Sequence, residues 1–234
     1  MRSESQIKII TLAIALAMGL AFTVALVCIS NFRQTTLGDE SNTPDLTESL
    51  LKFDTEPQQS NPTPNLGNGL LFSSNGDGTC ILSGIGSCTD TCVVVPTYSP
   101  AGELVTAIAP MALYGCNTLN AIQIPASVTS IGSLALAACP NLAYISVSAE
   151  NIAYRDVDGV LYSADLSVLL LYPPMRAGAN ATLSSATIKI ADMAFYRCIN
   201  LTRITYTGSP EQWEAISIGT KNYSLTAAAK AFEG

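Results

Sequence analysis

The order of apolar and polar residues divides the chain into three parts. Residues 9–29 form an uncharged run of 21 residues, and a helix of that length spans about 31 Å, the thickness of the hydrocarbon core of a bilayer. The run predicts a transmembrane signal anchor within residues 1–30. Cleavage after Ser30 is the alternative, because Cys28 and Ser30 are small, but the run is longer than the apolar centre of a signal peptide. Arg2 and Lys8 precede the run and favour a cytoplasmic N-terminus with the remaining chain outside.

Residues 31–68 are polar and acidic. Six Asp and Glu residues face only Arg33 and Lys52, and four prolines are spread among Ser, Thr, Asn and Gln. Such a segment has too little apolar surface to offset its ordering entropy. We therefore expect a disordered acidic linker, with a short helix over residues 46–53 as the alternative, since Leu46, Leu50 and Phe53 share a helical face.

Residues 69–234 repeat one apolar pattern. In three stretches the same spacing separates an Ile, a Cys, a Leu and a second Ile. The first two copies are 23 residues apart, and the third begins 59 residues after the second. This spacing is one period of 23 residues plus an atypical unit of 36 residues. The three copies are Ile108, Cys116, Leu119 and Ile122; Ile131, Cys139, Leu142 and Ile145; and Ile190, Cys198, Leu201 and Ile204.

Each unit is too small to bury its own apolar side, so like units must stack, with Ile over Ile and Leu over Leu. We expect Ile108, Ile131 and Ile190 to align in one buried stack. Alternation at Ile122 and Ile124 predicts a half-buried strand, and an Ala-Leu or Ala-Phe pair before each Cys predicts a short helical turn. The predicted fold class is α/β, dominated by β: a solenoid of leucine-rich-repeat period with short helical turns, preceded by one transmembrane helix and the linker.

The combined motif, V-T-x-I-(x)3-A-[LF]-(x)2-C-(x)2-L-(x)2-I-x-[IVY], resembles the BspA-like bacterial surface-antigen class of leucine-rich repeat proteins. Three further stretches agree with that class: Asp77–Pro96, Asn151–Pro173 and Tyr206–Trp213. The resemblance implies a solenoid outside the cytoplasm, at a bacterial cell surface or envelope, used for adhesion or protein binding. It implies no catalytic residues. Leu113 and Leu136 stand where Phe is usual in the class.

The ends of the solenoid need atypical units, because the outermost apolar layers would otherwise face water. We expect an N-terminal cap over residues 69–104, repeats over 105–205 and a C-terminal cap over 206–234. Trp213 is the largest side chain of the closing segment, and we predict that it covers the last layer rather than contacting a ligand.

The seven cysteines fall into different classes. Cys116, Cys139 and Cys198 share one repeat position, which predicts buried free thiols that pack as small apolar groups. Cys80 and Cys92 would face each other if their segments paired as a hairpin about Gly86. An exported location permits disulfides, so the sequence predicts a possible Cys80–Cys92 disulfide.

The composition limits the chemistry of the chain. It has no histidine and a net charge of -7, which argues against common acid–base and zinc sites and against nucleic acid as a partner. Asp156, Asp158 and Asp165 resemble part of a calcium loop, but Asp158-Gly159 reads more simply as a hairpin turn. We expect no enzyme, no metal and no cofactor.

Side chains between the inward Ile positions should point outward and offer a binding face. Tyr144 and Arg203 occupy one outward column, and Gln123, Ser146 and Thr205 occupy the next. Tyr and Arg are frequent at binding hot spots, so we expect Tyr144 and Arg203 to contact an unknown protein or surface ligand. The predicted function is a membrane-tethered interaction or adhesion module. An envelope spacer without a specific ligand is the alternative.

Overall fold

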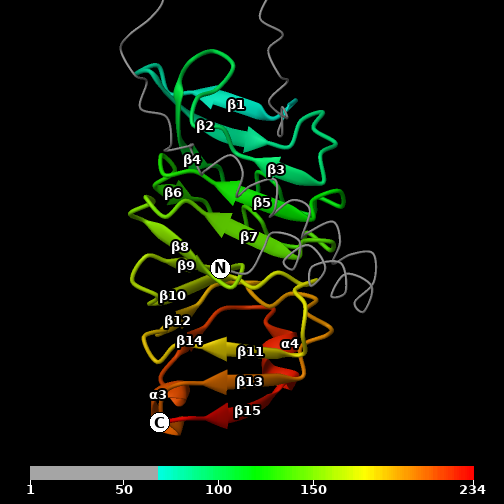
Figure 1. The fold of residues 1–234 in the computed structure, drawn as a ribbon, viewed down its shortest axis with the longest axis vertical. Coiled ribbons are helices and arrows are strands. Elements are labelled where there is room, and N and C mark those ends of the chain that lie inside the picture. Colours follow the sequence, from blue (N-terminus) through cyan, green and yellow to red (C-terminus); the bar gives the residue numbers. More distant parts are fainter. Residues whose placement is uncertain (1–67) are drawn as a thin grey trace, which may run out of the picture.

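A computed structural model describes residues 68–234 as a β-solenoid of six coils, each with two short strands joined by turns (Figure 1). The predicted transmembrane helix and acidic linker lie outside the described residues. Within residues 68–234, no helix is both long and apolar enough to span a membrane.

The first three coils form two parallel walls. One wall is a sheet with the order β1-β2-β4-β6, in which the antiparallel β1 edges the parallel strands; the other is the parallel sheet β3-β5-β7. The strands of the two walls are β1 (Leu71–Ser74), β2 (Thr79–Gly84), β4 (Leu104–Ile108) and β6 (Ser130–Ile131), and β3 (Cys92–Val94), β5 (Ala121–Ile124) and β7 (Tyr144–Val147).

The last three coils repeat this plan below the first three (Figure 1). Their strands are β10 (Val168–Leu171), β12 (Lys189–Ile190) and β14 (Ser217–Ile218) on one wall, and β11 (Asn180–Leu183), β13 (Arg203–Tyr206) and β15 (Ala229–Phe232) on the other. The sequence pattern revealed three repeats, and the structure adds coils before, between and after them.

A hairpin separates the two stacks. Its strands are β8 (Tyr154–Val157) and β9 (Val160–Ser163), and they join the wall of β10, β12 and β14 in the order β14-β12-β10-β9-β8. Asp158 and Gly159 both have positive φ, 51° and 81°, as the tight turns of two-residue hairpins require. The predicted Asp-Gly hairpin turn is therefore present.

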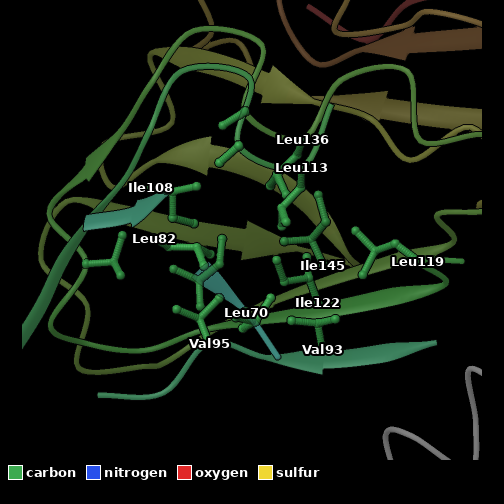
Figure 2. Packing of buried hydrophobic residues seen from close by; sticks show 14 of the residues in the cluster. Leu70, Leu82, Val93, Val95, Ile108, Leu113, Leu119, Ile122, Leu136 and Ile145 are labelled. Atoms are coloured by element: carbon green, nitrogen blue, oxygen red, sulfur yellow. The ribbon is translucent and has the colours of Figure 1, made fainter. Parts of the chain in front are cut away.

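The register explains why the repeat positions carry Ile. Ile122 pairs with Ile145 on β5 and β7, and Ile108 pairs with Ile131 on β4 and β6. Figure 2 shows Ile122, Ile145, Leu113 and Leu136 pointing into one interior between the walls. Because pairing keeps like side chains in one column, each coil covers the apolar side of its neighbour.

The interior consists of two separate clusters, one for each stack. Ile108 belongs to the first, with Ile131 packed against it, whereas Ile190 belongs to the second and pairs with Leu169 and Ile218. The expected single stack of Ile108, Ile131 and Ile190 is therefore wrong. The cause is the hairpin, which interrupts the column after Ile131.

Strands β9 and β10 divide the two clusters. Leu161 and Leu171 belong to the first cluster, while Val160, Tyr162 and Leu169 belong to the second. The alternation of side chains explains this division along β9. Along β10, Leu169 and Leu171 fall in different clusters because the register shifts between them. The two strands therefore act as a partition with a dry interior on each side. A strand buried on both faces needs apolar residues at every position. Val160-Leu-Tyr162 of β9 meets this need and is buried throughout, whereas Val168 and Leu170 of β10 are half-buried.

The repeat-core residues lie where their pattern placed them, with two exceptions. Cys116 and Ile131 are only half-buried, while the other ten are buried. The Ala-Leu and Ala-Phe pairs form hydrogen-bonded turns rather than helices, and a residue with positive φ, such as Met111, Leu134 or Met193, precedes each pair. The described residues form helices only in the sixth coil region, at α3 (Pro210–Glu214) and α4 (Tyr223–Ala227).

Trp213 lies on α3, whose start is capped by Ser209 and Gln212 in a capping box. The indole is buried and makes edge contacts with Tyr206 and Phe232, at ring-centroid distances of 5.4 and 6.4 Å. Phe232 belongs to β15, which pairs with β13. Trp213 thus packs between the fifth coil and the sixth, so it joins two layers instead of covering the last one.

Candidate binding surface

The outward residues of the second wall form aligned columns, interrupted by the hairpin. In β3-β5-β7, Ala121 pairs with Tyr144 and Gln123 pairs with Ser146. In β11-β13-β15, Arg203 pairs with Asn180 and Ala229, and Thr205 pairs with Thr182 and Ala231. Tyr144 and Arg203 therefore lie in different sheets, and the structure does not bring them into one site.

The two sheets differ in how far their outward residues reach solvent. Asn180, Thr182 and Arg203 are exposed and Thr205 is half-exposed. Tyr144, Gln123 and Ser146 are half-buried. The ring of Tyr144 lies so close to the hairpin that a Cβ added at Gly159 would meet its Cδ2 at 2.5 Å.

We call the outward residues of the later sheet the β11–β13–β15 face. It is defined by Asn180, Thr182, Arg203, Thr205, Ala229 and Ala231. This face carries a positive charge and no acidic side chain, and its polar groups stand in two straight columns on a parallel sheet.

Charge is distributed unevenly along the solenoid. Residues 68–147 contain three acidic residues and no Lys or Arg, whereas residues 168–234 contain six basic and four acidic residues, a net charge of +2. The hairpin region, residues 148–167, has four acidic residues and one Arg. The β11–β13–β15 face therefore lies in the basic part of a chain that is acidic as a whole.

Two hollows open where the stacks meet. One, of about 260 Å³, lies between the turn at Gly132–Ala137 and the strands β10 and β12, and is lined mostly by Leu, Ile and Ala. The other, of about 320 Å³, lies between the hairpin and β11, and is lined by Arg176 and Asp158 together with Tyr, Thr, Ser, Asn and aliphatic side chains. The second hollow borders the β11–β13–β15 face, because Asn180 and Thr182 belong to both.

The cysteines inside the stacks are suited to packing rather than to chemistry. Cys139 and Cys198 are buried free thiols, and burial raises their pKa to about 11 and about 12. The nucleophilic form of cysteine is the thiolate, which such pKa values disfavour near neutral pH. Each thiol instead donates to a carbonyl of the preceding coil, Leu113 O or Tyr172 O.

The predicted Cys80–Cys92 disulfide is wrong. Cys80 is a buried free thiol whose Sγ lies 3.6 Å from the carbonyl oxygen of Glu103. The expected hairpin does not form, because β2 pairs with β1 and β4 while β3 pairs with β5. The two cysteines thus belong to different walls of the solenoid.

The acidic residues of the hairpin have structural partners. Asp156 Oδ1 accepts a hydrogen bond of 2.8 Å from Val147 N, and burial raises the pKa of this carboxyl group. Asp165 Oδ1 accepts from Ser163 Oγ, Ser167 N and Ser167 Oγ, and these bonds lower its pKa to about 2. Among residues 68–234, no group of three or more His, Cys, Asp or Glu side chains is placed to hold a metal ion.

Taken together, the coils define a leucine-rich-repeat solenoid with exposed polar columns on one wall. The family model described as the BspA type leucine rich repeat region matches six copies, over residues 99–157 and 178–223. Residues 99–157 and 178–223 therefore match the BspA type of leucine-rich repeats, as the sequence motif predicted.

Several solved structures are similar to this chain. The pneumococcal vaccine antigen PcpA shows 21% identity over 57% of this chain and 32% of its own, with a TM-score of 0.48. A leucine-rich cell surface protein from Faecalibacterium prausnitzii shows 26% identity over 62% of this chain and 41% of its own, with a TM-score of 0.46. The chain thus spans less than half the length of either protein. No curated protein matches it.

The second hollow was not predicted from the sequence. Arg176 and Tyr172 follow the apolar run of β10, and they meet the hairpin only because β9 and β10 pair. The signal in the sequence was the pair of uninterrupted apolar runs, Val160-Leu-Tyr162 and Val168–Leu171, which is typical of strands buried on both faces. The prediction treated this region as an insertion between repeats.

Proposed function

We propose that this chain is a protein-interaction module held outside the cytoplasm by an N-terminal membrane anchor, and that the β11–β13–β15 face binds the partner. The observation that carries the proposal is the arrangement of that face. Its polar side chains stand in register on adjacent parallel strands, are open to solvent, and include Arg203 without a nearby acidic residue in the same columns.

The physical basis is the rigidity of the wall. Each strand is hydrogen-bonded to the next, and the inward side chains Ala181, Leu183, Ile204 and Tyr206 are buried. Outward side chains on such a scaffold lose little backbone entropy when a partner binds. A binding role agrees with the buried thiols of high pKa and with the absence of histidine from the chain.

The anchor and the location rest on the 21-residue apolar run and on the BspA-type repeats. In this arrangement residues 31–68 are a tether that lets the solenoid reach a partner at some distance from the membrane. Intact-mass measurement of the exported protein distinguishes the anchor from a cleaved signal peptide. A mass that includes residues 1–30 supports the anchor, and a mass that begins after Ser30 contradicts it.

Site-specific photo-cross-linking tests the proposed face. A photoreactive residue at Thr205 on β13 should yield a discrete cross-linked partner in cells that make the full chain. Lys189 on β12 is the matched control, because it is exposed on the opposite wall of the same coil. Selective cross-linking at Thr205, reduced by Arg203→Ala, supports the proposal. Equal cross-linking from both positions, or none from Thr205, overturns it and favours the spacer.

A further inference from the structure

The hollow of about 320 Å³ beside the β11–β13–β15 face has the size of a pocket for one side chain or small molecule. It lies between Val157, Asp158 and Val160 of the hairpin and Asn180 and Thr182 of β11. Its polar side chains therefore come from two segments that the fold alone brings together.

Arg176 is held in this hollow by the hairpin and by a tyrosine ring. Its Nε donates to the carbonyl oxygen of Asp158 at 3.0 Å, and its Nη1 donates to Tyr172 Oη at 3.4 Å. The guanidinium carbon also lies 5.5 Å from the centroid of the Tyr172 ring, within the range of a cation–π contact. These contacts fix the orientation of the guanidinium group.

The guanidinium group keeps unused donors. An arginine side chain has five N–H groups, and the two hydrogen bonds above occupy two of them. Within residues 68–234 the other three have no hydrogen-bond acceptor, although the Arg176 side chain is only 21% exposed. A partly buried cation with free donors favours an acceptor that enters the hollow.

The existing counter-charge of Arg176 is weak. Asp158 Oδ2 lies 3.8 Å from Nη2, too far for a hydrogen bond, and its side chain is 83% exposed. An ion pair so open to solvent stabilises the fold very little. The charge of Arg176 therefore remains available to a second carboxylate.

The rest of the lining fits a short aliphatic chain that ends in a carboxylate. Ala181, Val160 and Tyr162 provide apolar and aromatic surface, while Asn180 and Thr182 at the rim can donate hydrogen bonds. A guanidinium group binds a carboxylate through two parallel N–H···O bonds when both partners are free to align. The positive net charge of residues 168–234 attracts the same kind of ligand.

We propose that this hollow binds a glutamate or aspartate side chain of the protein partner, with Arg176 pairing with its carboxylate. The proposal rests on the protein-binding function above and identifies the chemistry that the partner presents: an acidic side chain that enters beside the β11–β13–β15 face. Asp158 competes for the same guanidinium group and so weakens the site.

NMR titration of the full chain with N-acetyl-L-glutamic acid α-amide, followed at the Arg176 Nε–H and the β11 amides, tests this proposal. N-acetyl-L-glutamine α-amide is the matched probe, because it has the same shape without the charge. We expect the glutamate probe to bind about tenfold more tightly, the effect of one charge-assisted hydrogen bond. Equal affinity of the two probes overturns the proposal.

Three variants locate the effect. Arg176→Gln should abolish the preference for the glutamate probe, and Asp158→Asn should increase its affinity several-fold. Lys189→Gln, exposed on the opposite wall of the solenoid, should change the affinity for the glutamate probe less than about twofold, since exposed charges act weakly. An unchanged preference in Arg176→Gln, or weaker binding in Asp158→Asn, contradicts the proposal.

Two readouts separate failure of the hollow from failure of the fold or of the function. Arg176→Lys keeps the charge and the packed aliphatic chain, so it should retain part of the preference even if Arg176→Gln folds poorly. If cross-linking at Thr205 succeeds while neither probe is preferred, the face binds a protein and only the role assigned to the hollow fails.

Discussion

The coils before the hairpin and those after it share one backbone plan but differ in charge and in surface. Residues 68–147 have no Lys or Arg, and the outward residues of β5 and β7 are at least half-buried. Residues 168–234 have six basic residues and expose Asn180, Thr182 and Arg203. The inward residues determine how the coils stack, so the outward residues can differ between the two stacks. This difference places the proposed binding surface in the later stack, residues 168–234.

The two interiors provide the largest test of this comparison. Ile145 on β7 and Ile204 on β13 occupy the same repeat position, and both are fully buried, one in each cluster. Ile145→Ala and Ile204→Ala should each lower the free energy of unfolding by about 4 kcal/mol, because each leaves a cavity. Urea denaturation measures the loss. A loss below about 1 kcal/mol in either variant would contradict the register of that stack.

The hairpin that separates the stacks can be broken at its turn. Gly159 has a φ of 81°, and an added Cβ would lie 2.5 Å from Tyr144 Cδ2. Gly159→Ala should therefore cost about 3 kcal/mol, from backbone strain and overpacking together.

Gly178 provides the matched control for that variant. It has a φ of 91°, but nothing lies within 4 Å of its added Cβ. Gly178→Ala should therefore cost only the backbone strain, about 1 kcal/mol. Thermal unfolding of both variants measures the difference. Equal costs would mean that Tyr144 does not pack against the hairpin.

The thiols test how dry each interior is. Cys139 and Cys198 are buried with pKa values of about 11 and about 12, whereas Cys116 is half-buried. At pH 8 only about one in a thousand Cys139 thiols is ionised, and fewer for Cys198. A thiol reagent should therefore modify Cys116 first, as mass spectrometry of the native protein would show. Equal rates at the three positions would contradict the packing.

The turn between β9 and β10 should produce the smallest effect. Hydrogen bonds from Ser163 and Ser167 lower the pKa of Asp165 from its ordinary value of 3.8 to about 2. Because the pKa of Asp165 is lowered in the folded state, its ionised carboxylate stabilises the fold above about pH 4. This stabilisation is lost as the pH falls toward about 2. NMR titration of the carboxyl carbon should give a midpoint near 2 in the native protein. A midpoint near 3.8 would show that these bonds do not form in solution.

Much of the solenoid could be predicted from three copies of one pattern. Ile122 and Ile145 pair as the spacing predicted, because stacking requires like residues at like positions. The fourth coil was harder to recognise, since β10 and β11 carry Leu169 and Ala181 opposite the motif residues Ile190 and Ile204. The inward residues of β10 and β11 are apolar, but their residue types differ from those that define the motif in the three recognised copies.

The candidate site could be predicted only in part. The outward positions of Arg203 and Thr205 follow from strand alternation and could be predicted. The separation of Tyr144 from Arg203 depends on the hairpin that lies between the two sheets. The hollow around Arg176 requires the pairing of β9 with β10. That contact brings Asp158 and Arg176 together across 18 residues, and no periodic pattern encodes it.

Native-state hydrogen exchange of the full chain tests most directly whether two coil stacks with separate interiors are joined at the hairpin. In Ile204→Ala, amides of β11, β13 and β15 should exchange faster while those of β3, β5 and β7 keep their protection, because the substitution opens one interior only. Ile145→Ala should give the reverse. Uniform acceleration across both sets of strands in either variant would contradict the partition by β9 and β10.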